Sequence, residues 1–175
     1  MTKLALHWTP SPHFDERPQV PVSLLVIHNI SLPPGQFGSS CIRDFFQGKL
    51  DLDRYPQLSE LKDVRVSAHA VIYRNGRVEQ FVDFDKRAWH AGKSSYQGRE
   101  RCNDFAIGIE LEGSDAVPFT RAQYDSLTSL TKYIQRKYPL ITLGSIVGHS
   151  DIAPDRKTDP GIAFDWPRYR KSLTG

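Results

Sequence analysis

Residues 148–161, with the sequence GHSDIAPDRKTDPG, bring reactive side chains together in a stretch that favours a loop. Two prolines and two glycines make a continuous helix or strand unfavourable there. His149 opens the stretch, and Lys157 and Asp159 lie near its end. A second imidazole, His28, lies at the end of an apolar run far upstream. These side chains are candidates for binding a metal ion and for stabilising charge beside it.

The residue types favour a metal site more strongly than the spacing does. Two imidazoles and one carboxylate, here His28, His149 and Asp159, are the ligand types of a catalytic zinc site, whose fourth position stays open to water. His149 and Asp159 are ten positions apart, however, and the sequence contains no H-x-x-x-H pattern. On spacing alone, a hydrogen bond within the loop is the more common relationship of such a pair, so both interpretations stay open at this point.

Three apolar runs predict the strands that would position these residues. SLLVIHNI at 23–30 reads as a strand buried on both faces, and ITLGSIVGH at 141–149 reads as a last strand that ends at His149. FAIGIELEG at 105–113 alternates large apolar residues with small or acidic ones, among them Glu110. Strand ends and the loops beyond them are common places for functional groups.

The remaining pattern predicts a hairpin and two helices. Residues 66–83 form two alternating runs around Asn75-Gly76, a strong hairpin signal. Residues 39–50 predict a short helix that is capped by Ser39 or Ser40 and ends at Gly48, and residues 120–139 predict a longer one with a Thr120/Gln123 capping box. Strands interleaved with helices indicate an α/β (α+β) fold with a central mixed β-sheet flanked by helices.

Composition bounds the class of protein. The 175 residues suggest one domain, 1–175, and the net charge of +3 suits an anionic small substrate but falls short of the basic patch of a nucleic-acid-binding protein. Cys41 and Cys102 are expected to be reduced thiols, with a single disulfide as the alternative. We find neither a signal-peptide run nor a membrane span, so we expect a cytoplasmic protein, a monomer that does not bind membranes.

A set of motifs extends this interpretation. LLVIHNIS, RVSAH, RAWHAG, SYQGRERCNDFAIGIELEG, GH and RKTDPG follow one another in this order and span roughly residues 10–170. Together they resemble the zinc N-acetylmuramoyl-L-alanine amidase family, which shares its fold with bacteriophage amidases and peptidoglycan recognition proteins. Within it, the sequence is most similar to the cytosolic branch that acts in peptidoglycan recycling. The resemblance implies a mixed sheet packed with helices and a shallow zinc groove on one side.

The resemblance also implies roles for five residues. His28, His149 and Asp159 become zinc ligands, and Glu110 and Lys157 become the catalytic pair. Zinc lowers the pKa of a bound water to about 7 and polarises an amide carbonyl. A carboxylate such as Glu110 can take a proton from water and give one to the leaving amine. An ammonium group such as that of Lys157 can stabilise the developing oxyanion.

Each of these residues has a structural alternative. Glu110 could be a solvated strand residue, with Glu112 as its rival on the same strand face, and Lys157 could be a surface lysine. Two further histidines are rival ligands: His69 is expected to be a core histidine that supports the site, and His90 is expected to line the groove. The sequence assigns no role to the two N-terminal histidines, His7 and His13.

The substrate implied by the resemblance is a small muropeptide, an anhydro-N-acetylmuramyl peptide cut between the sugar and L-Ala. Arginine suits the carboxylates of its stem peptide, and an aromatic ring suits its sugar. Candidate contacts are Asn29, Arg65, Trp89 and Arg101, for each of which a structural role is equally compatible with the sequence. Two alternatives stay open: a phage-type or periplasmic amidase acting on polymeric cell wall, and a non-catalytic peptidoglycan-binding module.

Overall fold

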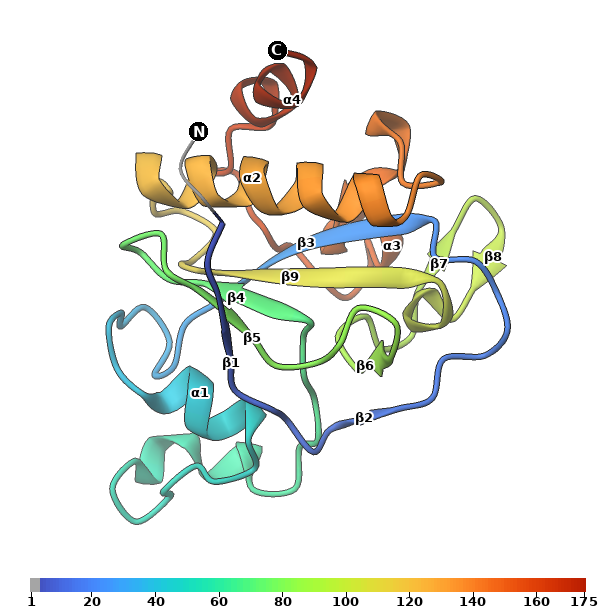
Figure 1. Ribbon diagram of the computed structural model, residues 1–175. Coiled ribbons are helices and arrows are strands. Elements are labelled where there is room, and N and C mark those ends of the chain that lie inside the picture. The colour runs from blue at the N-terminus through green and yellow to red at the C-terminus, as the bar shows by residue number, and fades with distance from the viewer. Residues whose placement is uncertain (1–3) are drawn as a thin grey trace.

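A mixed sheet of six strands forms the centre of the computed structural model, which describes residues 4–175 (Figure 1). Strands β4 and β5 pair antiparallel as a hairpin, whereas all other neighbours in the sheet are parallel. In spatial order the strands are β1 (Leu6–Trp8), β5 (Val78–Gln80), β4 (Ala70–Ile72), β9 (Ala106–Glu112), β3 (Leu24–Ile30) and β10 (Ile146–Gly148).

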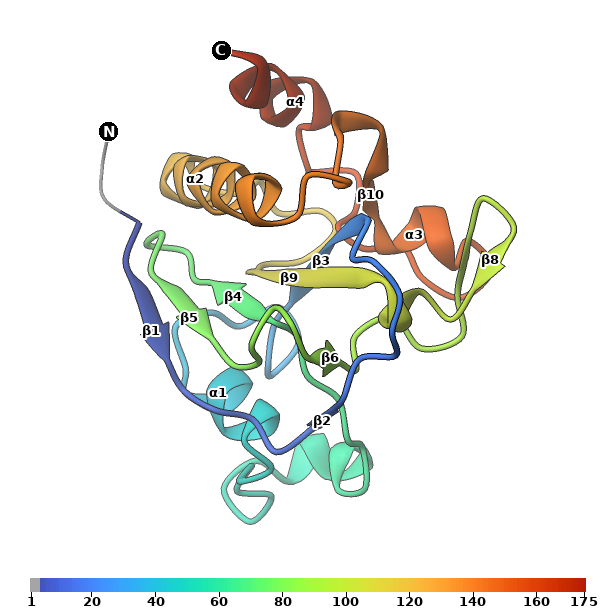
Figure 2. The same cartoon turned by 45° about the vertical axis from the view of Figure 1, so that its right-hand side comes forward.

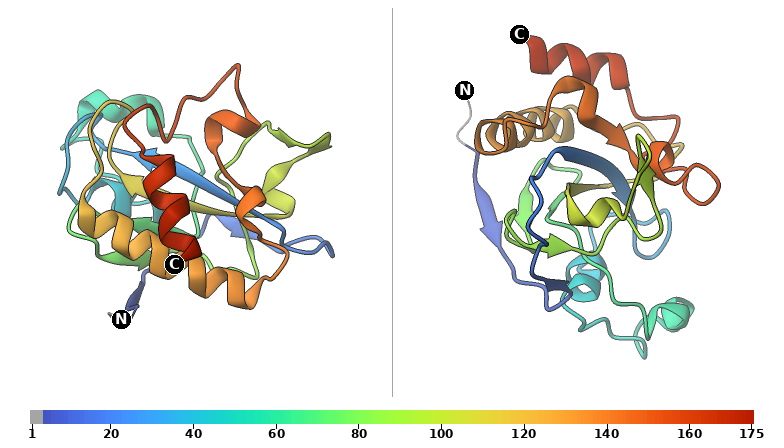
Figure 3. Two further views of the ribbon diagram at one scale, coloured as in Figure 1. Left: turned by 90° about the horizontal axis from the view of Figure 1, so that it is seen from above. Right: turned by 90° about the vertical axis from the view of Figure 1, so that its right-hand side faces the viewer.

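Helices cover both faces of this sheet. The long helix α2 (Arg121–Lys137) packs on one face, and the C-terminal helix α4 (Trp166–Thr174) lies against α2 on the same side (Figures 1 and 2). The short helix α1 (Cys41–Phe46) and the 3₁₀-helix η1 (Pro56–Leu61) lie on the opposite side, as the end-on view of Figure 3 shows. The predicted fold, a mixed sheet flanked by helices, is confirmed.

Alternation along the two central strands assigns side chains to these faces. Leu25 and Ile27 of β3 join Ile107 and Ile109 of β9 in the core beneath α2. The residues between them point to the other face, because successive side chains of a strand alternate. The face opposite α2 is therefore where β3 and β9 can present polar groups.

Helix α2 forms as its sequence predicts. Thr120 accepts a hydrogen bond from the backbone N–H of Gln123, and the Gln123 side chain accepts one from the backbone N–H of Thr120, which completes the capping box. Leu127, Leu130 and Ile134 are fully buried against the sheet. At about 25 cal/mol per Å² of buried apolar surface, such a stripe stabilises the helix more than its propensity alone can.

The predicted hairpin is present, with shorter strands than expected. Gly76 adopts a φ of +84° in the turn, a conformation that favours glycine. The regular pairing ends at β4 because the carbonyl of His69 accepts from the N–H groups of both Phe81 and Val82. His69 consequently lies just before β4 and outside the strand in which it was predicted.

The predicted strand at 141–149 was wrong in most of its length. Residues 143–145 form a 3₁₀ turn, η3 (Leu143–Ser145), only Ile146–Gly148 pairs with β3, and His149 begins a short helix, α3 (His149–Ile152). The stretch 148–161 therefore contains a helical turn that its prolines and glycines did not suggest. Its cause is local: the Asp151 carboxylate accepts a hydrogen bond of 2.7 Å from the N–H of Gly148 and caps the turn.

Small elements close the side of the molecule next to β9. β2 (Phe14–Asp15) pairs with β6 (Arg87–Ala88), β7 (Ser95–Tyr96) pairs with β8 (Arg99–Glu100), and the 3₁₀-helix η2 (Cys102–Asp104) leads into β9. Cys41 and Cys102 are buried free thiols, as expected. Among residues 4–175, no helix is both long and apolar enough to cross a membrane. The sequence argument about a signal peptide also covers residues 1–3, which lie outside the described part.

Candidate active site

His28 and Glu110 are direct neighbours across the two central parallel strands. The register of β3 and β9 pairs His28 with Glu110. Ile27, Ile109 and Leu111, which flank them, belong to the core beneath α2, so both side chains project from the opposite face. His28 is 1% exposed and Glu110 is 9% exposed, so the sheet holds both groups at the floor of a groove.

The third strand of this group, β10, delivers His149. β10 lies beside β3, and His149 follows it directly as the first residue of α3. The chain then turns back, and the carbonyl of Asp159 accepts a hydrogen bond of 3.0 Å from the N–H of Ser150. This backbone contact closes the loop and brings the Asp159 side chain beside His149.

Three ligand-type atoms converge at this point. Nδ1 of His28 lies 3.0 Å from Nδ1 of His149 and 3.1 Å from Oδ2 of Asp159, and the latter two atoms are 3.2 Å apart. Ligand atoms of tetrahedral zinc, each about 2.0–2.1 Å from the ion, are roughly 3.3 Å from one another. The donor types and their spacing therefore fit one small cation. A hydrogen bond within the loop between His149 and Asp159, the alternative interpretation, does not account for the position of His28.

Glu110 lies at the edge of this cluster without belonging to it. Its Oε1 is 4.0 Å from Nδ1 of His28, and its Oε2 is buried with no hydrogen-bond partner among residues 4–175. Burial raises the pKa of Glu110 well above its usual range and the charge of Asp159 raises it further, whereas the ammonium of Lys157 opposes them. The structure thus places a carboxyl group that readily holds a proton beside the three ligand atoms.

Lys157 and Trp89 line the same groove. Lys157 is half-buried in the loop before Asp159, and its N–H donates to the carbonyl of Ala153 at 2.9 Å. Trp89 donates from Nε1 to Asp15 at 3.1 Å, and its ring stacks on that of His13. His13, for which we predicted no role, therefore supports the groove wall through this stacking.

The predicted substrate contacts divide into two pairs. Asn29 and Trp89 line the groove, whereas Arg65 and Arg101 do not. Arg65 donates to the carbonyls of Lys62 and Val64. Arg101 borders a neighbouring hollow together with Arg156, and its Nε is 3.4 Å from the carboxylate of Asp104.

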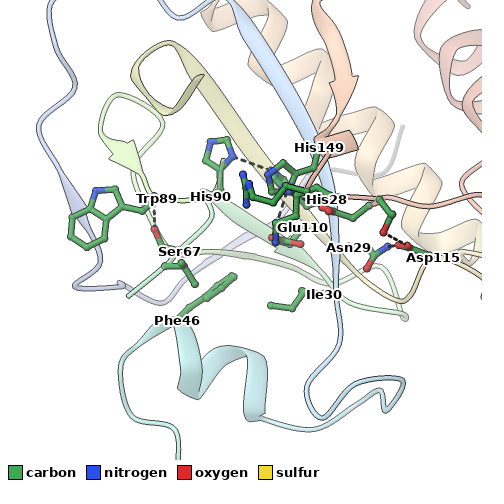
Figure 4. A pocket seen from close by; sticks show the side chains of 15 residues that line it. His28, Asn29, Ile30, Phe46, Ser67, Trp89, His90, Glu110, Asp115 and His149 are labelled. Atoms are coloured by element: carbon green, nitrogen blue, oxygen red, sulfur yellow. Dashed lines mark hydrogen bonds and ion pairs between the residues drawn. The ribbon is translucent and has the colours of Figure 1, made fainter. Parts of the chain in front are cut away.

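Asn29 is held by its surroundings. Its Nδ2 donates to the carboxylate of Asp115 at 2.7 Å and to the carbonyl of Pro160 at 3.0 Å. Both donor hydrogens therefore have partners in the protein, whereas Oδ1 accepts no hydrogen bond among residues 4–175. Sequence reasoning missed Asp115, because an aspartate in a surface turn carries no distinctive signal. Figure 4 shows Asn29 and Asp115 together at one end of the groove and Trp89 at the other.

His69 and His90 behave as their sequence positions suggested. His69 is fully buried, accepts from the N–H of Gly108 at 3.0 Å and lies 3.0 Å from the carbonyl of Lys86, so it is a satisfied core histidine. Arg17, another residue that the sequence did not mark, packs behind it with Nη2 3.2 Å from Nε2 of His69. His90 lines the groove and also contacts His28, a contact that was not predicted.

Comparison with known proteins places this arrangement among enzymes of one type. The profile of the family described as N-acetylmuramoyl-L-alanine amidase matches residues 18–162. A protein from Haemophilus influenzae, the 1,6-anhydro-N-acetylmuramyl-L-alanine amidase AmpD, is 62% identical over 164 residues, which cover 93% of this chain and 89% of that protein. The AmpD protein of Escherichia coli K12 is 57% identical over 163 residues, covering 92% and 88%.

Two solved structures bear on the site. A selenomethionine derivative of AmpD superposes with a TM-score of 0.93 at 53% identity, over 96% of this chain and 94% of that one. The amidase AmiD from E. coli, in complex with anhydro-N-acetylmuramic acid-L-Ala-D-γ-Glu-L-Lys, superposes with a TM-score of 0.62 at 34% identity, over 89% of this chain and 58% of that one.

Proposed function

Because this chain belongs to the N-acetylmuramoyl-L-alanine amidase family, we propose that it cleaves the amide bond between 1,6-anhydro-N-acetylmuramic acid and the L-Ala of a stem peptide. The observation that carries this proposal is the convergence of His28, His149 and Asp159 beside Glu110 in one groove. Relatives that are 55–62% identical over more than nine-tenths of the chain bear the name of this activity.

We assign the metal of this site as zinc. Two imidazole nitrogens and a carboxylate oxygen are zinc ligands, and three protein ligands leave the open position of a catalytic site. When bound, zinc supplies a Lewis acid that polarises the amide carbonyl and lowers the pKa of water to about 7. His28, His149 and Asp159 would hold it, and the burial of both imidazoles limits competition from solvent.

Glu110 is the proton carrier in this proposal. Its position on β9 fixes it beside the cluster, and Oε2 has no partner in the described chain that would compete with water or substrate. The carboxylate takes a proton from the attacking water, and the resulting carboxylic acid gives that proton to the leaving amine. The raised pKa of Glu110, caused first by its burial, favours the protonated form that the second step needs.

Lys157 supplies positive charge to the oxygen of the scissile carbonyl. It lines the groove two residues before Asp159, so its ammonium group and the cluster face the same volume. A fixed charge at the developing oxyanion stabilises the transition state more than the substrate. Arg156 next to it donates to the carbonyls of Ala91 and Lys93 at 2.7 and 2.8 Å, which ties this loop to the opposite wall.

The proposed biological setting is peptidoglycan recycling in the cytoplasm, by a monomer that acts on small soluble muropeptides. The net charge of +3 and the lysine and arginine side chains around the groove support an anionic substrate. A non-catalytic binding module would need neither a complete ligand set nor a buried Glu110, so the residues present favour the enzyme.

Product analysis by mass spectrometry tests this function. The zinc-loaded protein is incubated with an anhydro-N-acetylmuramyl tetrapeptide and, separately, with intact sacculi. We expect anhydro-N-acetylmuramic acid and free tetrapeptide from the first substrate and little peptide from the second. Release of peptide mainly from sacculi would favour an enzyme of polymeric wall, and no cleavage of either substrate would overturn the amidase assignment.

A further inference from the structure

The Nε2 atoms of His28 and His149 contact two consecutive residues, His90 and Ala91. Nε2 of His28 lies 2.9 Å from Nδ1 of His90, and Nε2 of His149 lies 3.1 Å from the carbonyl oxygen of Ala91. Both contacts are buried. A single short segment therefore contacts both imidazoles on the side away from the cluster, one from β3 and one from the start of α3.

The direction of these hydrogen bonds follows from what the cluster requires. A ring nitrogen that binds a metal has no proton, so Nδ1 of His28 and of His149 must be bare and their Nε2 atoms must carry the protons. The carbonyl of Ala91 can only accept, which suits His149. For His28, the partner Nδ1 of His90 must accept, so the proton of His90 is on its own Nε2.

A proton on Nε2 of His90 accounts for a buried polar atom without a hydrogen-bond partner. Nε2 of His90 is buried and has no hydrogen-bond partner among the described residues. An unsatisfied buried N–H is rare in proteins, and each instance calls for a reason. The reason here is that neutral His90 can accept at Nδ1 only when its proton is on the unpartnered Nε2.

The surroundings of His90 hold its ring in one place. Gly108 of β9 lies against the ring, and a Cβ at that position would be 2.4 Å from Cγ of His90. The backbone N–H groups of His90 and Ala91 both donate to Oδ1 of Asn103, at 3.2 and 2.8 Å. Asn103 in turn is anchored at its carbonyl by Nη1 of Arg17 at 2.9 Å.

We propose that His90 and Asn103 are positioning residues of this enzyme, which fix the tautomer and the orientation of His28 and His149 through one anchored segment. His90 acts on His28 directly, and Asn103 acts on both imidazoles by holding the backbone of residues 90–91. Neither residue touches substrate in this role. The inference rests on the zinc site proposed above and adds residues beyond its ligands.

Zinc affinity of the purified protein, measured by competition with a chromophoric chelator, tests the role of His90. His90→Phe keeps a ring of similar size and removes the acceptor, and we expect zinc to bind about 10- to 100-fold more weakly. His90→Asn places an oxygen where Nδ1 was, so it should recover most of the affinity. His90→Gln places its oxygen near the position of Nε2, so it should not. His7→Phe, at an exposed histidine that does not line the groove, is the control and should bind zinc as the wild type does.

The outcomes separate this inference from the proposed function. Equal zinc affinity of wild type, His90→Phe and His90→Gln would overturn the positioning role and leave the zinc site standing. A wild-type protein that binds no zinc would instead overturn the zinc site itself, and the inference with it. If His90→Phe does not fold, the comparison of Asn with Gln still decides, because both are polar and differ in where the acceptor lies.

Two variants of Asn103 test whether this residue positions the imidazoles by holding the backbone of residues 90–91. Asn103→Asp keeps the oxygen that accepts from residues 90 and 91, and Asn103→Leu removes it at similar volume. We expect Asn103→Leu to weaken zinc binding and to change the visible spectrum of the cobalt-substituted protein, which reports ligand geometry. Asn103→Asp should preserve that spectrum. If Asn103→Leu keeps both the spectrum and the zinc affinity of the wild type, Asn103 does not position His28 and His149.

Discussion

A hydrogen bond joins the hydroxyl of Thr158 to the carboxylate of Asp115, and Thr158 lies between Lys157 and Asp159 in the chain. The other oxygen of the same carboxylate accepts from Asn29, the neighbour of His28 on β3. One acidic side chain thus connects the loop that carries two of the proposed site residues to the strand that carries a third.

This connection predicts the effect of removing Asp115. Asp115→Ala deletes two hydrogen bonds to a charged group, each worth about 1.5–3 kcal/mol, so both stability and kcat/KM should fall. We expect at least about a tenfold loss of kcat/KM, because Lys157 and Asp159 lose their fixed position. Asp63→Ala, an exposed aspartate without such contacts, is the control. Equal activity of Asp115→Ala and wild type would show that the loop is held without this contact.

Metal content is the second prediction. The purified protein should contain about one zinc ion per chain, and a strong chelator should abolish its activity in a way that added zinc reverses. His149→Ala and Asp159→Ala should lose metal and activity together, because each removes one of three ligands. Elemental analysis and an amidase assay on the same samples check this. Full activity in metal-free protein would contradict the ligand assignment.

The third prediction separates the catalytic pair from the ligands. Glu110→Gln and Lys157→Ala should keep zinc and lose about 10²-fold or more in kcat, because both groups act in the reaction and neither binds metal in this assignment. Parallel zinc analysis is the essential measurement. Loss of zinc from Glu110→Gln would make Glu110 a ligand, and normal turnover in either variant would remove that residue from the mechanism.

A fourth prediction concerns stability at low pH and a buried carboxylate far from the groove. Glu79 is 2% exposed and accepts hydrogen bonds from Thr9, Tyr73, Arg43 and Arg77. Burial alone would raise the pKa of Glu79, but these donors hold it below its ordinary value. A carboxyl group whose folded pKa is depressed stabilises the protein above its unfolded pKa, about 4.3, and loses that contribution as the pH falls further.

Urea unfolding at pH 7 and at pH 3.5 checks this expectation. Glu79→Gln should cost about 2 kcal/mol at pH 7, because it removes the charged acceptor of hydrogen bonds from four side chains, among them the partly exposed guanidinium groups of Arg43 and Arg77. The cost should shrink at pH 3.5, where the Glu79 carboxyl of the unfolded wild-type chain takes up a proton and the folded state gains less from holding it ionised. Glu16→Gln is the control, since the ion pair of Glu16 with Lys86 is exposed and should change stability by less than about 0.5 kcal/mol. If Glu79→Gln lowers the free energy of unfolding equally at both pH values, protonation of Glu79 does not contribute to the loss of stability at low pH.

The fifth prediction concerns the sugar. The 1,6-anhydro bridge makes a rigid bicycle and removes a hydroxyl, so a groove shaped for it loses contacts with a reducing sugar. A few hydrogen bonds at about 1–1.5 kcal/mol each give a ten- to hundredfold preference in kcat/KM. Anhydro and reducing-end muropeptides with the same stem peptide provide the comparison. Equal values would rule out the recycling substrate and leave the amidase chemistry in place.

Much of the sheet could be predicted from short-range pattern. Alternation along 105–113 correctly separated Ile107 and Ile109 from Glu110, because burial on one face imposes a period of two. The Asn75-Gly76 turn and the capping box of α2 were also predicted correctly, since both depend on a few adjacent residues. The helical turn after β10 was missed, because one capping contact from Asp151 outweighs the composition of its surroundings.

The contacts that complete the site could not be predicted in the same way. His90 and Asn103 meet His28 and Ala91 through long-range packing, and nothing in their local sequence specifies that packing. The same holds for Arg17, which reaches His69 from 52 positions away. Arg65 and Arg101 lie within the motifs RVSAH and GRERCND, and yet neither lines the groove.

Strand β3 lies in the sheet between β9 and β10, and both neighbours come later in the chain. During synthesis, which runs from the N-terminus, residues 24–30 have no central partner until residue 112 has left the ribosome. Glu110 then arrives with β9, but His149 and Asp159 arrive only after β10. Under the proposed zinc assignment, the three ligands are therefore present together only near the end of synthesis, and metal capture belongs to that stage.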